Sequence, residues 1–499
     1  MTTGQMSLFA GPQIAAKPLQ HAAFSHDAAC PQIERLALEA VYGGLLEETD
    51  EFNRQLVSFQ ANKTETLHSW VKYREGFSAT LVERLLSQFG VKPGATVLDP
   101  FAGSCTTLLV AQALGINAVG IELLPNSHFA WEVKRQAYAY DVNELDRVRQ
   151  VVRDHTPPPT TDHFPHLTIT ESAFPAATER DLMDYTRWFE AMDISKEAKE
   201  ICRFALMSLL ESVSYTRKDG QYLRWDGRAT KIRGANEKRI AHARKPIEGI
   251  DKGELPSVRE ELIKALDRIR HDVVTLQRET PPLSRQQLIE GSTLYRLPEL
   301  PADQFAAVIT SPPYANRYDY TRTYALELAY LGAGEDIFRL RQALLSCTVE
   351  NRPKLVDLRN HYRSLGREKD YERTLGLVRS NAALNEINVA LKMRSQQGEI
   401  NNTGVLTMLD QYFTELTFVY AELFRTCRSG ASVAFVNDNV RYAGEIVPVD
   451  LLSTDLAQAV GFEPEVIYVL PQRKGNSSQQ MGRYGRVELR KSITVWRKA

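Results

Sequence analysis

The sequence contains few cysteines and no cluster of metal-binding side chains. Its five cysteines are far apart and form no Cys-x-x-Cys pair: Cys30, Cys105, Cys202, Cys347 and Cys427. This spacing excludes a disulfide framework and a structural zinc site. It favours a protein of a reducing compartment that needs no metal.

The chain also lacks a long apolar run and an excess of charge of either sign. No stretch approaches the ~18 apolar residues that span a bilayer. The first residues contain no basic segment followed by an apolar run, the pattern of a secretory signal. We therefore expect a cytoplasmic protein without a membrane segment. The net charge over 499 residues is -1, so evidence for a nucleic-acid partner must come from local charge.

The clearest pattern in the chain is strand, turn, helix, strand. A helix of apolar periodicity comes first, and a Gly-containing turn follows the first strand. The expected elements are helix 80–89, strand 95–98, turn 99–107, helix 108–114 and strand 118–121. This order is typical of the start of a nucleotide-binding α/β sheet. Because G-x-G-x-x-G is absent, we favour a nucleoside without phosphates as the ligand.

The rest of the sheet is interrupted by two long stretches that look helical. Further strands are expected at 287–289, 305–310, 432–436, 465–470 and 492–496, with a long helix at 406–427. The last two strands could form an antiparallel hairpin at the sheet edge. We expect an N-terminal extension, three core segments and two helical insertions. In chain order they are extension 1–60, core 61–125, insertion 126–285, core 286–331, insertion 332–404 and core 405–499.

Two sites carry the chemistry. The turn from Asp99 to Thr107 lets backbone approach a ligand, and Glu122 follows at the distance where an acid binds ribose hydroxyls. Asp99 is expected to face the positively charged part of the ligand. The second site is Ser311-Pro312-Pro313-Tyr314, directly after the apolar strand 305–310. Its prolines end the strand and leave a rigid loop without N–H donors, suited to an amino group, and Tyr314 offers a flat face to a planar ring.

Either site alone also fits an ordinary structural turn, but the combination resembles one family. DPFAGSCTT (99–107) resembles the cofactor motif of S-adenosylmethionine-dependent DNA amino-methyltransferases, and TSPPY (310–314) resembles their catalytic motif. FSATLVERLL (77–86), GIELLP (120–125) and LIEGST (288–293) resemble further motifs of that family. Cys105 stands where the first motif has a second glycine, and Ser292 where these enzymes often have Asp.

The resemblance implies a Rossmann-like class I methyltransferase sheet, mostly parallel with an antiparallel last strand, and two helical insertions. It makes the first insertion, 126–285, the candidate target-recognition region. It implies a set of residues for S-adenosyl-L-methionine: Phe77, Asp99, Pro100, Phe101, Gly103, Ser104, Thr106, Glu122 and Ser292. The catalytic set is Ser311, Pro312, Pro313 and Tyr314. The substrate is double-stranded DNA with a flipped base, and a partner restriction endonuclease or defence system is possible. The serine form of the motif favours cytosine N4 over adenine N6.

A basic segment in the first insertion supports a DNA partner. Residues 217–245 carry ten Lys and Arg against three acids, with aromatic residues interleaved. Such an excess suits a phosphate backbone, although a solvated helix face explains it equally well. The candidate DNA contacts in this segment are Arg217, Lys218, Arg224, Arg228, Lys231 and Arg233. Arg473 and Lys474 join them from the loop before the last strand.

Other functions remain open. The same catalytic loop could serve an RNA base amino-methyltransferase. A degenerate methyltransferase fold kept as a nucleic-acid-binding subunit is also possible, and Cys105 and Ser292 favour it. Methylation of the cytosine ring carbon by a Cys105 thiolate is less favoured, because that chemistry uses a Pro-Cys pair that this chain lacks.

Overall fold

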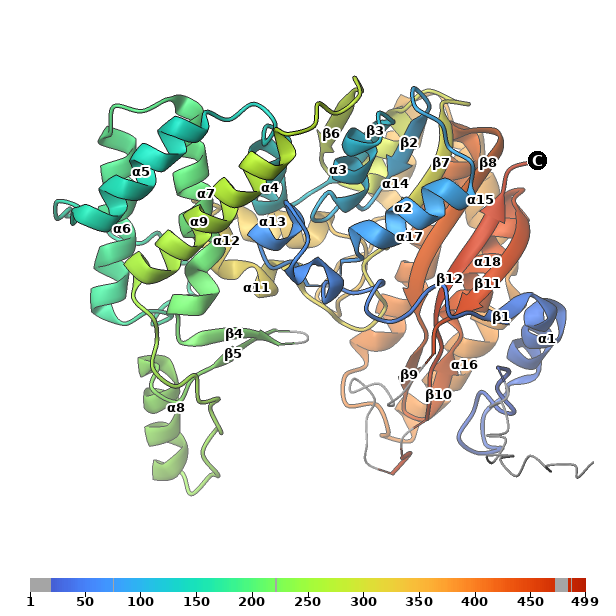
Figure 1. The fold of residues 1–499 in the computed structure, drawn as a ribbon. Helices are drawn as coiled ribbons and strands as arrows, with labels where there is room; N and C mark the ends of the chain where they lie inside the picture. The colour runs from blue at the N-terminus through green and yellow to red at the C-terminus, as the bar shows by residue number, and fades with distance from the viewer. Residues whose placement is uncertain (1–18, 75, 220–221, 472–482, 486) are drawn as a thin grey trace, which may run out of the picture.

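An eight-stranded sheet forms the centre of the protein (Figure 1). The computed structural model describes residues 19–74, 76–219, 222–471, 483–485 and 487–499. The strand order is β1-β11-β12-β8-β7-β2-β3-β6. The strands of this sheet are β1 Leu46–Glu48, β2 Thr96–Asp99, β3 Asn117–Glu122, β6 Gln286–Glu290, β7 Phe305–Thr310, β8 Cys427–Asp438, β11 Glu463–Val469 and β12 Lys491–Arg497.

The strand directions confirm the predicted fold class. Strands β6, β3, β2, β7 and β8 are parallel neighbours, and β12 is antiparallel to both β8 and β11. Strand β1 was not predicted, because three residues are too short to show a period. It pairs in parallel with β11 and forms the edge, so the β11–β12 pair lies inside the sheet rather than at its margin.

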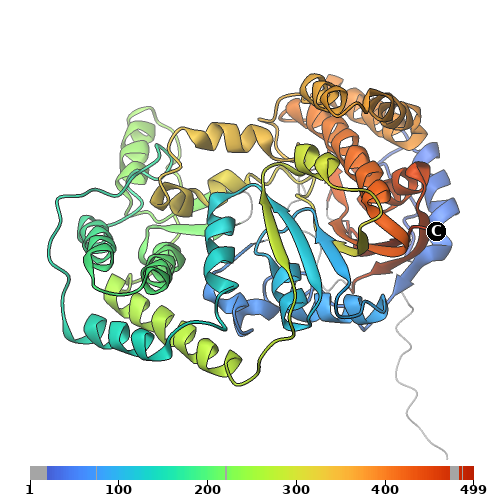
Figure 2. The same ribbon diagram turned by 90° about the horizontal axis from the view of Figure 1, so that it is seen from above.

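Helices cover both faces of the sheet, as the turned view in Figure 2 shows. On one face α2, α3 and α4 belong to the hydrophobic core that contains Val97 and Ala118; on the other, α10, α17 and α18 belong to the core that contains Leu98 and Val119. Successive residues of a strand point to opposite faces, which explains why continuous apolar runs form these strands. These helices are α2 Ala79–Gln88, α3 Thr106–Ala113, α4 Pro125–Lys134, α10 Thr293–Arg296, α17 Gly404–Thr426 and α18 Val449–Val460.

A helical lobe between β3 and β6 stands beside the sheet (Figure 1, left). Its helices are α5 Val142–Asp154, α6 Ala176–Ala191, α7 Lys196–Val213, α8 Thr230–Ala241 and α9 Val258–Leu276. It also contains a two-stranded hairpin, β4 Thr216–Asp219 and β5 Tyr222–Trp225. The sequence did not predict this hairpin, because its short strands carry too many charges to show an apolar alternation.

The remaining helices lie between β7 and β8 or near the chain start. They are α1 Ile33–Tyr42, α11 Tyr320–Thr323, α12 Ala325–Tyr330, α13 Asp336–Ala343, α14 Leu355–Ser364, α15 Glu368–Ser380 and α16 Ala382–Gln396. Helices α15 and α16 pack against α17, and α1 packs against α16. A second hairpin, β9 Val440–Tyr442 with β10 Glu445–Val447, follows β8.

In the part of the chain that the structure describes, no helix is long and apolar enough to cross a membrane. The same part holds no group of three His, Cys, Asp or Glu side chains arranged for a metal ion. The five cysteines are buried free thiols.

Candidate active site

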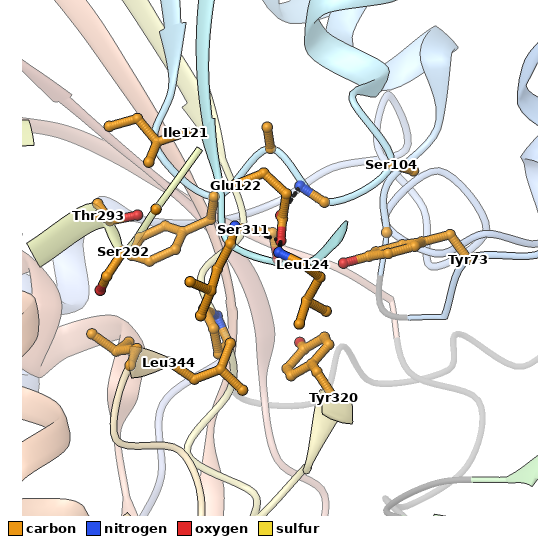
Figure 3. Close-up of a pocket in the computed structure, with 18 of the residues that line it drawn as sticks. Tyr73, Ser104, Ile121, Glu122, Leu124, Ser292, Thr293, Ser311, Tyr320 and Leu344 are labelled. Atoms are coloured by element: carbon orange, nitrogen blue, oxygen red, sulfur yellow. Dashed lines mark hydrogen bonds between the residues drawn. The ribbon is translucent and has the colours of Figure 1, made fainter. Parts of the chain in front are cut away.

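A cavity opens at the carboxyl ends of β2, β3, β6 and β7 (Figure 3). It encloses about 760 Å³, including its open mouth. The segments that follow the four parallel strands supply much of its wall, because the carboxyl ends of parallel strands share one edge. Ligands of open α/β sheets bind at this edge.

Most of the predicted cofactor-binding and catalytic residues line this cavity. Those present are Phe77, Phe101, Gly103, Ser104, Thr106, Glu122, Ser292, Ser311 and Pro313. The cavity therefore joins the predicted cofactor motif and the predicted catalytic loop. Asp99, Pro100, Pro312 and Tyr314 are not part of its lining.

The Glu122 carboxylate is fixed by backbone donors. Its Oε2 accepts from the N–H of Gly103 at 2.7 Å, and its Oε1 accepts from Leu123 and Leu124 at 2.8 and 2.7 Å. Burial raises the pKa of Glu122, while these N–H groups act in the opposite direction. Glu122 therefore links the first turn to the end of β3 and presents a fixed acceptor to the cavity, the place where a ribose diol is bound in such sheets.

Asp99 has a different place from the one we predicted. It is fully buried, and its carboxylate accepts from Thr310 Oγ1 at 2.7 Å and Thr107 Oγ1 at 2.8 Å. It ties the cofactor turn to the end of β7 and cannot face a ligand in this structure. Pro100 also serves the framework, since its carbonyl accepts a hydrogen bond from Thr293 Oγ1.

The buried Asp99 should make stability depend on pH. Burial raises its pKa to about 6, so the folded state holds this proton more tightly than the unfolded chain. The protonated Asp99 therefore contributes about 3 kcal/mol to the free energy of unfolding. This contribution is fully present below about pH 4 and is lost as the pH rises through about 6. We expect Asp99→Asn to lack this loss. Urea unfolding between about pH 4.5 and about pH 7.5 should show that the free energy of unfolding of the variant rises relative to that of the wild type. A difference between the two proteins that does not depend on pH would contradict this role.

Gly103 and Cys105 shape the turn before α3. Gly103 has φ +50°, and a Cβ at this position would lie 2.9 Å from Tyr73 Oη. Cys105, which replaces the family's second glycine, adopts φ 61° and is fully buried outside the cavity lining. The cysteine therefore keeps the left-handed conformation of a glycine without placing its side chain in the ligand space.

The catalytic loop is only partly exposed to the cavity. Ser311 Oγ donates to Tyr314 Oη at 3.1 Å and lies 3.4 Å from the carbonyl oxygen of Val436. Tyr314 is 4% exposed, and the Lys491 ammonium lies 5.1 Å from its ring centroid. Since the Ser311 hydroxyl hydrogen is used within the protein, its lone pairs remain to accept from a ligand. A ring that stacks on Tyr314 must first displace the groups that cover it.

Comparisons with known proteins agree with this geometry. Over the full length of both chains, the protein is 53% identical to Type II methyltransferase M.BsoBI of Geobacillus stearothermophilus. It is 39% identical to Type II methyltransferase M.AvaI of Anabaena variabilis, over 93% of this chain and 92% of that one. A family model described as DNA methylase matches residues 39–128, which include the cofactor turn and Glu122. The chain belongs to the N6/N4 DNA methylase family. Methylases of this family use S-adenosylmethionine as the methyl donor.

The methylase cavity also contains residues that the sequence analysis missed. Tyr73 and Tyr320 lie on one side of it and Leu344 on another, and the Tyr73 hydroxyl points toward the middle (Figure 3). Tyr73 is held by Tyr324, whose ring stacks on it at 5.2 Å. Tyr73 lies only four residues before Phe77, so the start of the FSATLVERLL motif was a usable signal. Leu344 follows α13, far from any recognised motif, and no sequence signal could have identified it.

The predicted DNA contacts that the structure describes lie on or beside the β4–β5 hairpin and α8. Arg217 and Arg224 are directly opposite one another on the two strands, and both are exposed. Lys231 and Arg233 are exposed on α8, with the Lys231 ammonium 5.1 Å from the Trp225 ring centroid. Like charges placed opposite each other in a hairpin are unfavourable for folding. The two arginines therefore place positive charge side by side on the surface of the hairpin.

Four predicted contacts need separate treatment. Lys218 is 2% exposed, forms an ion pair with Glu327 and lies 4.7 Å from the Tyr324 ring centroid. It holds the hairpin against the core, and we remove it from the proposed DNA contacts. Arg228 is exposed but pairs with Asp226 at 2.8 Å. Arg473 and Lys474 lie outside the described residues.

Proposed function

We propose that this methylase transfers a methyl group to the exocyclic amine of a flipped base in double-stranded DNA, with cytosine N4 favoured over adenine N6. The observation that carries the proposal is the single cavity lined by both Glu122 and Ser311. A cofactor held at the first residue and an amine held at the second would meet in one space.

The cavity suits S-adenosylmethionine. Phe77, Phe101 and Leu344 supply apolar surface for an adenine ring, and Glu122 supplies a fixed acceptor for the ribose hydroxyls. Ser104 and Thr106, at the start of α3, would hold the amino-acid end. When bound, S-adenosylmethionine supplies an electrophilic methyl group on a positively charged sulfur.

The protein's part in the reaction is to position the amine. The Ser311 oxygen and the Pro312 carbonyl accept the two amine hydrogens, which turns the nitrogen lone pair out of conjugation and toward the methyl group. Methyl transfer would release the donor as a neutral thioether, and the methylated amine would lose one proton to solvent. Neither Pro312 nor Pro313 has an N–H that could compete for the lone pair.

The choice of base rests on the serine of the catalytic motif. SPPY resembles the form found in enzymes that act on cytosine N4, whereas adenine enzymes more often have Asp or Asn at the first position. Ser311 lines the cavity, and its hydroxyl oxygen has lone pairs that can accept from an amine. A neutral hydroxyl acceptor is therefore the feature that favours cytosine.

DNA would be held by the hairpin and α8. A two-stranded ribbon fits the major groove, and the exposed Arg217 and Arg224 supply charge for phosphates or base edges. The residue range 126–285 is thus the proposed target-recognition region.

Because the relatives are named type II methyltransferases, a partner restriction endonuclease is also proposed. The five buried free thiols fit a cytoplasmic location.

Replacing Arg217 should separate DNA binding from folding. We expect Arg217→Gln to lower affinity for duplex DNA by about tenfold and to reduce the salt dependence of binding by about one phosphate contact. Folding stability should be unchanged or slightly higher, since a repulsion with Arg224 disappears. Lys196→Gln, on the 82%-exposed Lys196 of α7, is the matched control. Fluorescence anisotropy at several salt concentrations measures both effects, and equal behaviour of the two variants would contradict the assignment.

Nucleoside mass spectrometry tests the proposed function. DNA and RNA from cells that express the wild type or Ser311→Ala should be digested and compared. We expect N4-methylcytosine in DNA from the wild type only. N6-methyladenine in DNA would change the assigned target base from cytosine to adenine. Methylated RNA alone would favour an RNA enzyme, and the absence of any methylated base would favour a degenerate binding subunit.

A further inference from the structure

Arg317 occupies an unusual position in the catalytic loop. It follows Tyr314 by three residues and has φ 66°, a conformation that residues with a Cβ rarely adopt. Such backbone conformations persist only where the surrounding structure enforces them, and they gather at ligand-binding sites. The loop therefore holds this side chain at a defined place next to the proposed target site.

Tyr442 of β9 fixes the loop and the side chain together. Its hydroxyl donates to the carbonyl oxygen of Ala315 at 2.5 Å, and the Arg317 guanidinium carbon lies 5.9 Å from its ring centroid. A guanidinium that rests on an aromatic face keeps its N–H groups at its edges, where they can bind an anion.

The positive charge of Arg317 has no counter-charge among the residues that the structure describes. Its Nε is buried without a hydrogen-bond partner. The nearby carboxylate of Asp319 is already taken, because it pairs with Arg322 at 3.2 Å and with Arg341 at 2.9 Å. Leaving a partly buried cation unpaired is unfavourable, so an anion from outside the protein is the expected partner.

We propose that Arg317 binds the DNA backbone phosphate next to the flipped target nucleotide. This inference rests on the proposed function, because a base held near Ser311 and Tyr314 brings its flanking phosphates to the same loop. A phosphate accepts two parallel N–H donors from a guanidinium, a geometry that lysine cannot reproduce. Arg317 is thus a nucleotide-positioning residue, distinct from the proposed DNA contacts of the hairpin.

The salt dependence of DNA binding tests whether the positive charge of Arg317 contacts a DNA phosphate. Arg317→Gln should lower affinity for a duplex containing the methylated site by roughly tenfold or more and reduce the slope of log K against log salt by about 0.9. Arg317→Lys should keep the slope but lose affinity. Arg428→Gln is the control, because Arg428 is exposed at the amino end of β8, at the opposite sheet edge from the cavity. A purely structural role for Arg317 would leave the slope unchanged.

Neutral methylphosphonate linkages locate the phosphate. The wild type should lose affinity when the phosphate on one side of the target nucleotide is neutral, and Arg317→Gln should lose nothing further at that position. Equal losses in both proteins, or an unchanged salt slope, would overturn the proposal. Mass spectrometry of the wild-type product distinguishes the two failures: a wild type that methylates no DNA refutes the proposed function and this inference with it.

Discussion

Tyr314→Ala is expected to slow methyl transfer by about 100-fold while S-adenosylmethionine binds as before. Stacking of a base on an aromatic ring contributes roughly 1–3 kcal/mol, and loss of the ring also loosens the loop that positions the amine. Cofactor affinity should not change, because Tyr314 is not part of the cavity lining. Single-turnover transfer and calorimetric titration of the cofactor measure the two quantities separately.

Tyr314→Phe is the matched control for this result. It keeps the ring and removes only the hydroxyl that accepts from Ser311 at 3.1 Å. We expect its transfer rate within about fivefold of the wild type, since a typical hydrogen bond contributes about 1 kcal/mol. Transfer by Tyr314→Ala within about threefold of the wild type, with cofactor binding intact, would remove Tyr314 from the proposed catalytic residues.

Gly103→Ala should weaken S-adenosylmethionine binding by at least about tenfold. A Cβ at this position would lie 2.9 Å from Tyr73 Oη and 3.0 Å from its ring atoms. Tyr73 is stacked on Tyr324, so its ring cannot move away without disturbing the cavity wall. A tenfold loss corresponds to about 1.4 kcal/mol, which lies within the roughly 1–3 kcal/mol that such overpacking costs.

Gly90→Ala separates the overlap from the backbone strain. Gly90 also has a positive φ, +62°, but a Cβ there would meet nothing within 4 Å. Both alanine variants should therefore lose stability through strain of about 1–2 kcal/mol, and only Gly103→Ala should lose cofactor affinity. Tyr73→Phe should restore part of that affinity in the double variant. Equal cofactor affinity in the two alanine variants would contradict the contact with Tyr73.

The sheet was predictable because its strands are continuous apolar runs bounded by Gly and Pro. Residues 305–310 were predicted as a strand with the bounds that β7 has in the structure. Several strands of three or four residues were missed, since β1 and the β4–β5 hairpin depend on partners far away in the sequence or across a turn. Pairing, rather than local preference, determines such strands.

The site was predictable only where a motif marks it. Glu122 and Ser311 were found because each ends a strand and carries a recognisable pattern, and both line the cavity. Asp99 was misjudged because sequence shows which strand a side chain ends but not toward which face it turns. Leu344 and Lys218 could not be interpreted from sequence, since their roles come from contacts between segments more than 100 residues apart, such as the pair of Lys218 with Glu327.

A structure of the ternary complex tests the central claim most directly. The protein should be bound to a duplex containing its methylation site and to an unreactive analogue of the methyl donor. We expect the donor analogue beside Glu122 and Phe77 and the flipped base against Ser311, with the target amine about 3–3.5 Å from the position of the transferable methyl group. A donor analogue bound outside this cavity, or a target base held away from Ser311, would contradict the account.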